Sequence, residues 1–444
     1  MFIELGNHYW AKQNGDDYFV FHSFNGEPFV VTKDIFDNIL SKQISDNLKE
    51  DLEEVGYFED DRLFTQHIEK TKTYIQNYDG PVVLDLILSE SCNLSCHMCS
   101  HAHATEQTNV RNISKKLMNF ETAKLWIDYY VDFYPSIKKL NRYSFHYGAA
   151  EPLINKKVFL QVLEYINQKT KDKNLEVEQL INSNLTLLDD EVIEYLVKYN
   201  VKVSVGLDGL QEQNDAIRVD KKGNGTFEKI FQNIRKLLER KVSVGVALTM
   251  TEKNFENIVP RDFLIAMKEL GISTVLVDSD FIHRVKFSGE DVTSKLVEFY
   301  KIGDEIGIEI VGSWRTPFSN LTTENNDEPK SFCTSLLGKN ITVTPSKCLT
   351  FCTYSGTPLS FYNLEEIDKS VKLFVEQVKI LMQEQLPTQN KHCVNCVVSG
   401  FCSGGCYLTY EVTKKHFTMC DIYIGATDKL IDYKFETEYR VQNS

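Results

Sequence analysis

The segment Val82-Val83-Leu84-Asp85-Leu86-Ile87-Leu88 leads through Ser89-Glu90-Ser91 into Cys92-Asn93-Leu94-Ser95-Cys96-His97-Met98-Cys99, and these pieces together indicate the fold and the chemistry. The first piece is apolar and rich in β-branched residues, which predicts a β-strand. The loop after it carries three cysteines. Three thiolates on one loop can hold three irons of a 4Fe-4S cube and leave the fourth iron without a protein ligand. A structural zinc site normally requires a fourth ligand, and the next cysteine along the chain is Cys333.

Short β-branched runs alternate with helical patterns from this segment to about residue 280. Such an alternation indicates parallel βαβ units. The expected strands are residues 82–88, 143–147, 176–181, 201–205, 242–247 and 274–277. The expected helices are residues 120–133, 157–168, 189–199 and 227–240. About six strands predict an α/β fold built on a partial (βα)6 TIM-type barrel, which is short of the closed eight-fold form.

The segment before the barrel has a different pattern. Residues 19–21 and 28–31 are expected to be strands joined through Asn25-Gly26, and two helices should follow over residues 32–40 and 46–55. We interpret residues 1–75 as a small winged-helix-like domain. The barrel is expected over residues 80–285, a bridging region over 286–330, and a cysteine-rich domain over 331–444.

Composition excludes several classes of protein. The 444 residues exceed what one core usually supports, so two or three domains are expected. No stretch approaches the roughly 18 apolar residues of a membrane span, and the N-terminus has no secretory pattern, so we expect a cytoplasmic protein without a membrane partner. A net charge of -14 with scattered Lys and Arg argues against nucleic-acid binding. The 11 cysteines then favour metal or redox chemistry over disulfides.

The remaining eight cysteines lie near the C-terminus, at Cys333, Cys348, Cys352, Cys393, Cys396, Cys402, Cys406 and Cys420. Eight thiolates suffice for two fully ligated 4Fe-4S clusters. Two zinc knuckles are the alternative, because Cys-x2-Cys pairs also occur in zinc ribbons.

The spacing Cys92-x3-Cys96-x2-Cys99 resembles the signature of the radical S-adenosylmethionine (SAM) superfamily. The resemblance implies that the open iron chelates SAM and that a 5'-deoxyadenosyl radical abstracts hydrogen from a substrate. Ala149-Ala150-Glu151-Pro152 stands where the superfamily has Gly-Gly-Glu-Pro, which implies that Glu151 lies near the SAM amino group. Two alanines there are unfavourable if the loop needs positive φ. The same resemblance implies that Ser204 lies near the ribose and Arg218 near the SAM carboxylate.

The second cysteine group resembles the SPASM domain, an auxiliary-cluster module of some radical SAM enzymes. The resemblance rests on Cys393-x2-Cys396-x5-Cys402-x3-Cys406 together with the flanking cysteines, although Val343 replaces a glycine that is usual in the module. It implies one cluster near the barrel, held by Cys333, Cys348, Cys352 and Cys406. It implies an outer cluster held by Cys393, Cys396, Cys402 and Cys420. The expected cofactors are therefore SAM and three 4Fe-4S clusters, one binding SAM and two auxiliary.

Enzymes with this combination largely modify peptides or proteins. We expect a maturase of a ribosomally made precursor peptide that installs a cross-link, with a Cys thioether as the leading product and a carbon-carbon link as another. Residues 1–75 would bind the leader sequence, and flavodoxin or ferredoxin would supply electrons. An anaerobic sulfatase-maturating enzyme, which forms formylglycine, is the first alternative. A non-enzymatic zinc-binding adaptor is the alternative of another class.

Overall fold

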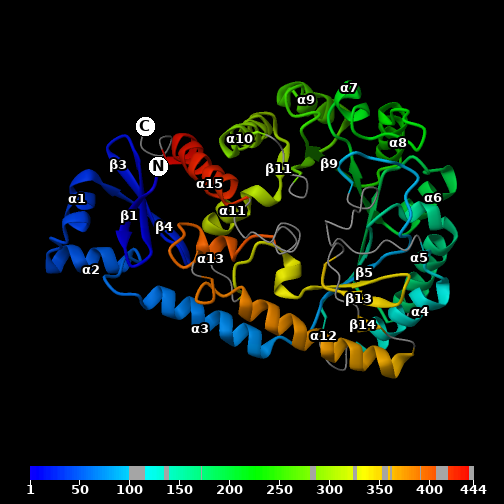
Figure 1. The fold of residues 1–444 in the computed structure, drawn as a ribbon, viewed down its shortest axis with the longest axis horizontal. Coiled ribbons are helices and arrows are strands. Elements are labelled where there is room, and N and C mark those ends of the chain that lie inside the picture. Colours follow the sequence, from blue (N-terminus) through cyan, green and yellow to red (C-terminus); the bar gives the residue numbers. More distant parts are fainter. Residues whose placement is uncertain are drawn as a thin grey trace.

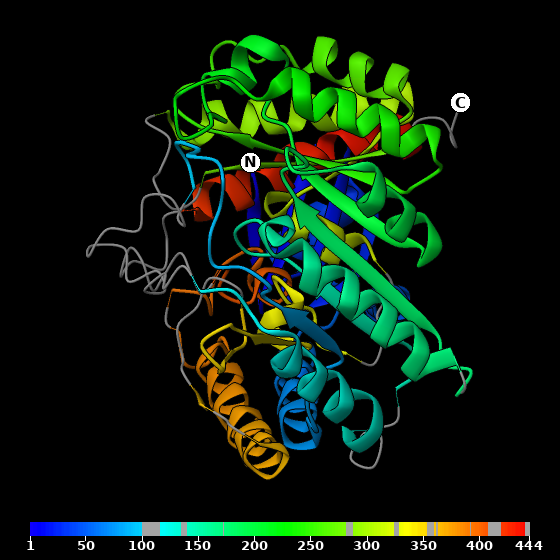
Figure 2. The same cartoon turned by 90° about the vertical axis from the view of Figure 1, so that its right-hand side faces the viewer.

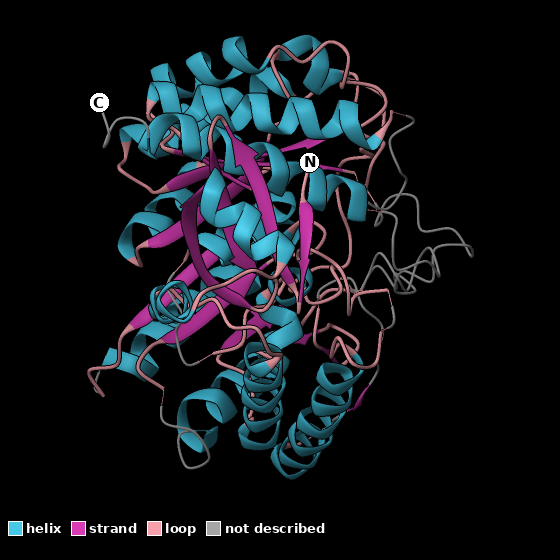
Figure 3. Cartoon of the chain, turned by 90° about the vertical axis from the view of Figure 1, so that its left-hand side faces the viewer, coloured by secondary structure: helices cyan, strands magenta, loops and turns pink. Residues whose placement is uncertain are grey.

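A computed structural model of the protein describes residues 1–99, 116–134, 140–171, 173–280, 287–323, 328–352, 359–360, 363–390, 392–406 and 419–439. A ten-stranded sheet occupies the centre of the described structure (Figure 1), and a separate four-stranded sheet lies at its N-terminal side. In the side views (Figures 2 and 3), helices pack along one face of the curved large sheet.

The large sheet has the strand order β11-β10-β9-β8-β7-β6-β5-β12-β13-β14. Its strands are β5 (Val83–Leu86), β6 (Tyr143–Tyr147), β7 (Val177–Ser183), β8 (Val201–Gly206), β9 (Val244–Met250), β10 (Thr274–Ser279), β11 (Glu309–Val311), β12 (Asn340–Val343), β13 (Cys348–Thr350) and β14 (Leu359–Ser360). The pairs from β11 to β12 are parallel, and β13 and β14 are antiparallel additions. The predicted α/β fold with an open parallel barrel is confirmed.

The barrel helices are α4 (Phe120–Asp128) with a π-helical end (Tyr129–Phe133), α5 (Lys156–Lys171), α6 (Asp190–Lys198), α7 (Gln211–Asp215), α8 (Phe227–Glu239) and α9 (Pro260–Leu270). Alternate strand residues face these helices. Tyr147 of β6 packs on Phe159 of α5 at 5.2 Å between ring centroids, and Phe145 packs on Tyr130 at 5.4 Å. The intervening residues therefore face the interior of the barrel, because side chains alternate across a strand.

The parallel sheet extends beyond the expected boundary at residue 285. The segment expected to be a bridge contains α10 (Gly289–Ile306), β11 and α11 (Thr316–Thr322), and β11 continues the sheet beside β10. On the opposite side, β12 of the cysteine-rich region pairs in parallel with β5. Neither strand was predicted, because runs of three and four residues are too short to show a period.

The N-terminal unit is a four-stranded antiparallel meander followed by helices. Its elements are β1 (Ile3–Gly6), β2 (Tyr9–Asn14), β3 (Asp17–His22), β4 (Asn25–Thr32), α1 (Lys33–Ser41), α2 (Asp46–Glu54) and α3 (Arg62–Asn77). The predicted strands and helices are present, but β1, β2 and α3 were not predicted. The turn between β1 and β2 places Asn7 and His8 at positive φ without the Asn-Gly pair that signals a hairpin.

The C-terminal region contains α12 (Leu364–Glu384), α13 (Ser399–Cys402) and α15 (Cys420–Lys434), which continues into a π-helical turn (Phe435–Tyr439). In Figure 1, α15 lies between the N-terminal sheet and α10, and α3 and α12 run along the lower edge of the molecule. Among the helices that the structure describes, none is long and apolar enough to cross a membrane.

The N-terminal unit is anchored to the C-terminal region by buried polar contacts. Lys12 of β2 is 3% exposed, and its Nζ lies 2.7 Å from an oxygen of Asp428 and 2.9 Å from an oxygen of Asp432, both on α15. The Gly400 N–H donates to the Ser23 carbonyl at 3.0 Å. A Cβ at Gly400 would lie 2.7 Å from that carbonyl oxygen, so this approach requires glycine.

Candidate active site

The loop with the first three cysteines lies at the carboxyl edge of the parallel sheet, just after β5. Its backbone is held by the segment after α7, because Ser95 N–H donates to the Val219 carbonyl at 2.8 Å and His97 N–H donates to the Ile217 carbonyl at 3.0 Å. Cys99 N–H donates to the Cys96 carbonyl at 3.2 Å, which turns the loop back on itself. Ligands bind at this edge in open and barrel-shaped parallel folds.

The three thiols of the loop lie close to one another in a poorly solvated place. Burial raises the pKa of Cys96 to about 12, and the neighbouring Cys99 and Cys92 act in the same direction, whereas the Arg218 guanidinium opposes them. Burial also raises the pKa of Cys92. Thiolates are therefore disfavoured here without a cation, and a bound cluster would supply the required charge. Three thiols on one loop match the number of protein ligands of a 4Fe-4S cluster with one open iron.

Glu151 lies beside this loop but does not face solvent. Its side chain is fully buried, and its oxygens accept from Leu153 N–H at 2.9 Å, Ser183 Oγ at 2.9 Å and Asn184 N–H at 2.8 Å. Burial raises the pKa of Glu151 to about 7, although these hydrogen bonds oppose the shift. The carboxylate of Glu151 links the loop after β6 to the end of β7, so it holds these two segments in place next to the cysteine loop.

Of the two alanines before Glu151, Ala149 has the strained backbone. Ala149 has φ +76°, in the left-handed region that glycine adopts readily, which agrees with the glycine expected at this position. A left-handed alanine is unfavourable by roughly 1–2 kcal/mol. The loop therefore keeps its shape with alanine, and surrounding contacts hold it there. One of them is the bond from Glu151 N–H to the Ser91 carbonyl at 3.1 Å.

Arg218 is paired with a buried acid behind the cysteine loop. Its Nε lies 2.6 Å from an oxygen of Asp208, which is fully buried, and Asp208 also accepts from Thr249 N–H at 2.8 Å. A Cβ at Gly206 would lie 2.3 Å from an Arg218 nitrogen, so glycine makes room for the guanidinium. The structure thus places Arg218 near the cysteine loop, where the Asp208 carboxylate neutralises part of its positive charge.

Ser204 lies on β8 at the level of Asn182 on β7 and Gly245 on β9. It is half-buried and belongs to the strand face that points away from the helices. It therefore faces the barrel interior, as expected of a residue near a ligand.

Sequence reasoning missed a polar cluster on the same interior face. His146 Nδ1 lies 3.2 Å from an oxygen of Asp85, and the other Asp85 oxygen accepts from Asn340 Nδ2 at 3.2 Å and from Thr342 Oγ1 at 3.1 Å. Asn340 and Thr342 come from β12, so the cluster forms only when the C-terminal region adds its strand to the barrel. The alternation of β5 places Asp85 on the interior face, but nothing local identifies its partners.

Four C-terminal cysteines line one cavity. They are Cys393, Cys396, Cys402 and Cys420, the set expected to hold the outer cluster. Burial raises the pKa of Cys402, and the thiols of Cys396, Cys420 and Cys393 raise it further. Four thiols around one cavity match the number of ligands of a fully ligated 4Fe-4S cluster.

The other C-terminal set is only partly assembled. Cys333 and Cys406 lie close enough for Cys406 to raise the pKa of Cys333, after the larger effect of burial. Cys348 begins β13, and Cys352 follows that strand by two residues. The structure thus brings Cys333 to Cys406 and places Cys348 and Cys352 together on a neighbouring hairpin.

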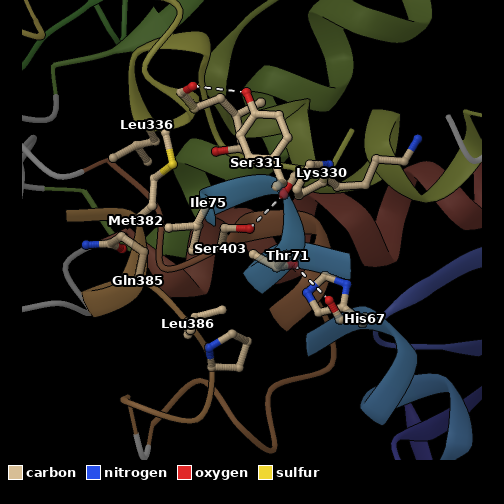
Figure 4. A pocket seen from close by; sticks show the side chains of 14 residues that line it. His67, Thr71, Ile75, Lys330, Ser331, Leu336, Met382, Gln385, Leu386 and Ser403 are labelled. Atoms are coloured by element: carbon tan, nitrogen blue, oxygen red, sulfur yellow. Dashed lines mark hydrogen bonds between the residues drawn. The ribbon is translucent and has the colours of Figure 1, made fainter. Parts of the chain in front are cut away.

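A separate cavity lies between α3 and the C-terminal region (Figure 4). The labelled His67, Thr71 and Ile75 come from α3, and Met382, Gln385, Leu386 and Ser403 come from the C-terminal region. Burial lowers the pKa of His67 to about 4, so the imidazole is neutral. Ser403 Oγ donates to the Lys330 carbonyl at 3.0 Å across this space. The cavity contains no cluster of cysteines and is not the site formed by the first cysteine loop.

Comparison with known proteins places these features in a family context. Residues 86–260 match the model of the Radical SAM superfamily. The radical SAM cyclopropyl synthase TigE of Paramaledivibacter caminithermalis is 22% identical over 385 residues, which cover 83% of this chain and 78% of that protein. The serine-type anaerobic sulfatase-maturating enzyme of Bacteroides thetaiotaomicron is 29% identical over 180 residues, 40% of this chain and 41% of that one.

Two solved structures share the fold. The structure of anSMEcpe with bound AdoMet and the Cp18Cys peptide superposes with a TM-score of 0.64 at 17% identity, covering 82% of this chain and 99% of that chain. The crystal structure of Streptococcus suis SuiB bound to the precursor peptide SuiA gives a TM-score of 0.53 at 13% identity, covering 92% and 96%. At these identities the likeness shows a common fold.

Proposed function

Because the chain is a radical SAM enzyme with a cysteine-rich C-terminal region of the SPASM kind, we propose that it modifies a ribosomally made precursor peptide and installs a cross-link. A Cys thioether is the leading product, and a carbon-carbon link is the second. The observation that carries the proposal is that one chain combines three converging thiols at the carboxyl edge of the barrel with a second, four-thiol cavity beside an antiparallel N-terminal unit.

The cofactors proposed are SAM and three 4Fe-4S clusters. Cys92, Cys96 and Cys99 would hold the SAM-binding cluster, which supplies reductive SAM cleavage when bound. Ser204 and Arg218 would contact SAM, and Glu151 would hold the surrounding loops. The two C-terminal cysteine sets described above would hold the auxiliary clusters. A low-potential reductant such as flavodoxin or ferredoxin and a cytoplasmic location complete the proposal.

Thioether formation from a C–H and an S–H group removes two electrons and two protons from the peptide. With SAM and the cluster bound, one hydrogen atom would pass to the radical that SAM cleavage supplies, and the thiol proton would pass to solvent or a base. The remaining electron must leave through the protein. Four thiols around one cavity leave no open iron for a substrate thiolate, so we assign electron removal to the outer cluster.

The N-terminal unit is proposed to bind the leader of the precursor along the edge of β4. This strand is at one end of the sheet order β1-β2-β3-β4, and it pairs on one side with β3. An edge strand offers unpaired main-chain groups to an extended peptide, and the alternate side-chain pockets give specificity. Helices α3 and α11 also lie near β4, so the leader would follow the part of the edge that they leave uncovered.

Pro28 shows which residues of β4 point outward. Proline lacks an N–H group, so in a strand its nitrogen faces away from the paired neighbour. Phe29, Val30 and Val31 lie opposite Val20, Phe19 and Tyr18 of β3, and by alternation from Pro28 we infer that the Val30 N–H also faces outward. We predict that Val30→Pro weakens leader binding by about fivefold, because one main-chain hydrogen bond contributes about 1 kcal/mol.

The measurement is fluorescence anisotropy with a labelled peptide that carries the leader sequence of a candidate precursor. Val30→Ala is the matched control, since it removes the same side chain and keeps the N–H, and it should bind within about twofold of the parent. Far-ultraviolet circular dichroism checks that the sheet is intact. Parental affinity in Val30→Pro would rule out strand addition at this edge. Deleting residues 1–75 is a poorer test, because it also removes Lys12 and Ser23. Their buried partners in the C-terminal region, Asp428 and Gly400, would then be exposed.

A sulfatase-type maturase is the second candidate, and a specific observation favours it. The match to the serine-type maturase has 29% identity, higher than the 22% to TigE, although it covers less of the chain. Such an enzyme would convert a Cys or Ser of a sulfatase peptide to formylglycine. Mass spectrometry after incubation with such a peptide and with the candidate precursor separates the two functions.

A further inference from the structure

We propose that Asn184 tunes the reduction potential of the cluster held by Cys92, Cys96 and Cys99, through an N–H···S hydrogen bond to Cys92. Asn184 Nδ2 lies 3.6 Å from Cys92 Sγ, within the range of hydrogen bonds to sulfur, and Leu94 N–H also donates to this sulfur at 3.4 Å. The proposal rests on the cluster that the proposed function assigns to this loop. It concerns electron transfer and not the peptide substrate.

The Asn184 amide is held in the orientation that this bond needs. Its Oδ1 accepts from Thr186 N–H at 2.9 Å and from the Thr186 hydroxyl at 2.6 Å. The NH2 end must then point the other way, toward Cys92, and it also donates to Asn93 Oδ1 at 3.1 Å. Asn93 Nδ2 donates to Thr186 Oγ1 at 2.7 Å, which closes the ring.

The backbone under Asn184 is equally constrained. Its N–H donates to Glu151 at 2.8 Å, and the next residue, Leu185, is buried with φ +58°. A leucine in the left-handed region is unfavourable, and such strain persists only where surrounding contacts hold it. Two hydrogen bonds hold it here. Leu185 N–H donates to Ser183 Oγ at 3.0 Å, and Asn233 Nδ2 donates to the Leu185 carbonyl at 2.8 Å.

Hydrogen bonds to ligating sulfurs are among the factors that set iron-sulfur potentials. A donor stabilises the more negative, reduced cluster, so it raises the potential. Asn184 is 8% exposed, and water therefore does not weaken the interaction greatly. Residues that touch a ligand without binding the metal are known to tune metal sites. Asn184 is thus a positioning residue for this cluster, and Glu151 and Thr186 support it.

The test is an EPR-monitored redox titration of the full-length, anaerobically reconstituted holoenzyme without peptide. The catalytic cluster is identified as the one whose signal SAM changes. Asn184→Ala should shift its midpoint to a more negative potential, and Asn184→Asp should shift it further because it places a carboxylate beside the sulfur. Thr186→Val should give a smaller shift in the same direction. Asn167→Ala, at an exposed position of helix α5 on the outside of the barrel, should leave the midpoint at the parental value.

Iron and labile sulfide are measured in every variant. A parental midpoint in Asn184→Ala with parental iron would overturn the proposal. Loss of the catalytic cluster from both Asn184 variants would also overturn it, since Asn184 would then be a support for cluster binding and not a tuning residue. The readout needs no peptide, so failure here leaves the peptide assignment untouched. Failure of that assignment likewise leaves the midpoint shifts standing.

Discussion

Replacing Cys92, Cys96 and Cys99 together by alanine is expected to abolish formation of 5'-deoxyadenosine from SAM. These three thiols converge on one loop and leave an open iron in the cluster that they would hold. Without that cluster, the proposed assignment leaves no open iron that could chelate SAM and reduce it. The measurement is chromatography of the reaction after reduction with dithionite, and the expected activity is at the detection limit.

The matched control replaces three cysteines of the outer set, Cys393, Cys396 and Cys402, by alanine. This variant should lose one cluster's iron and keep uncoupled SAM cleavage, because its cavity is separate from the first cysteine loop. The catalytic-loop variant should show the reverse, with iron retained in the C-terminal region. SAM cleavage at the parental rate in the catalytic-loop variant would contradict the assignment of Cys92, Cys96 and Cys99.

Arg218→Ala is expected to destabilise the fold by about 3–5 kcal/mol, because it leaves the buried Asp208 carboxylate without its partner. Sequence reasoning alone predicted only a higher SAM requirement. The segment that carries Arg218 also holds the cysteine loop through Ile217 and Val219. We therefore expect loss of cluster iron along with stability. Urea unfolding and iron analysis together measure the effect.

The double variant Arg218→Met with Asp208→Asn is the control for the ion pair. It removes both charges, and it should recover most of the stability lost in Arg218→Ala, since neither side chain then carries an unpaired charge. A parental unfolding midpoint for Arg218→Ala, with only a weaker apparent affinity for SAM, would instead show that Arg218 serves SAM and not Asp208.

The loss in Arg218→Ala should depend on pH. Burial raises the pKa of Asp208, and the Arg218 guanidinium opposes this rise. Without Arg218 the folded-state pKa of Asp208 moves further above its unfolded value. A raised carboxyl pKa destabilises the fold above the unfolded pKa of about 3.9, so the variant should approach the parent at acid pH and lose stability as the pH rises.

The sequence was sufficient to predict those elements that have a long period or a clear spacing. The six strands β5 to β10 were predicted, the clearest of them from β-branched runs, and the outer cysteine set lines one cavity. In both cases the signal is local: a strand shows its own alternation, and Cys393, Cys396 and Cys402 are close in sequence.

The remaining features depend on contacts between distant segments. The polar cluster at Asp85 is completed by Asn340 and Thr342 of β12, more than 250 residues further along the chain, and a three-residue strand such as β11 has no period to detect. Glu151 was expected beside SAM from its motif, whereas its burial and its three donors became visible only in three dimensions. The Asn184-Thr186-Asn93 ring is likewise set by folding and not by a motif.

Iron, acid-labile sulfide and zinc in the anaerobically purified protein test the central claim most directly. Three 4Fe-4S clusters predict about twelve irons and about twelve sulfides per chain, with zinc well below one equivalent. Stoichiometric zinc without labile sulfide would contradict the account and leave a zinc-binding adaptor in its place.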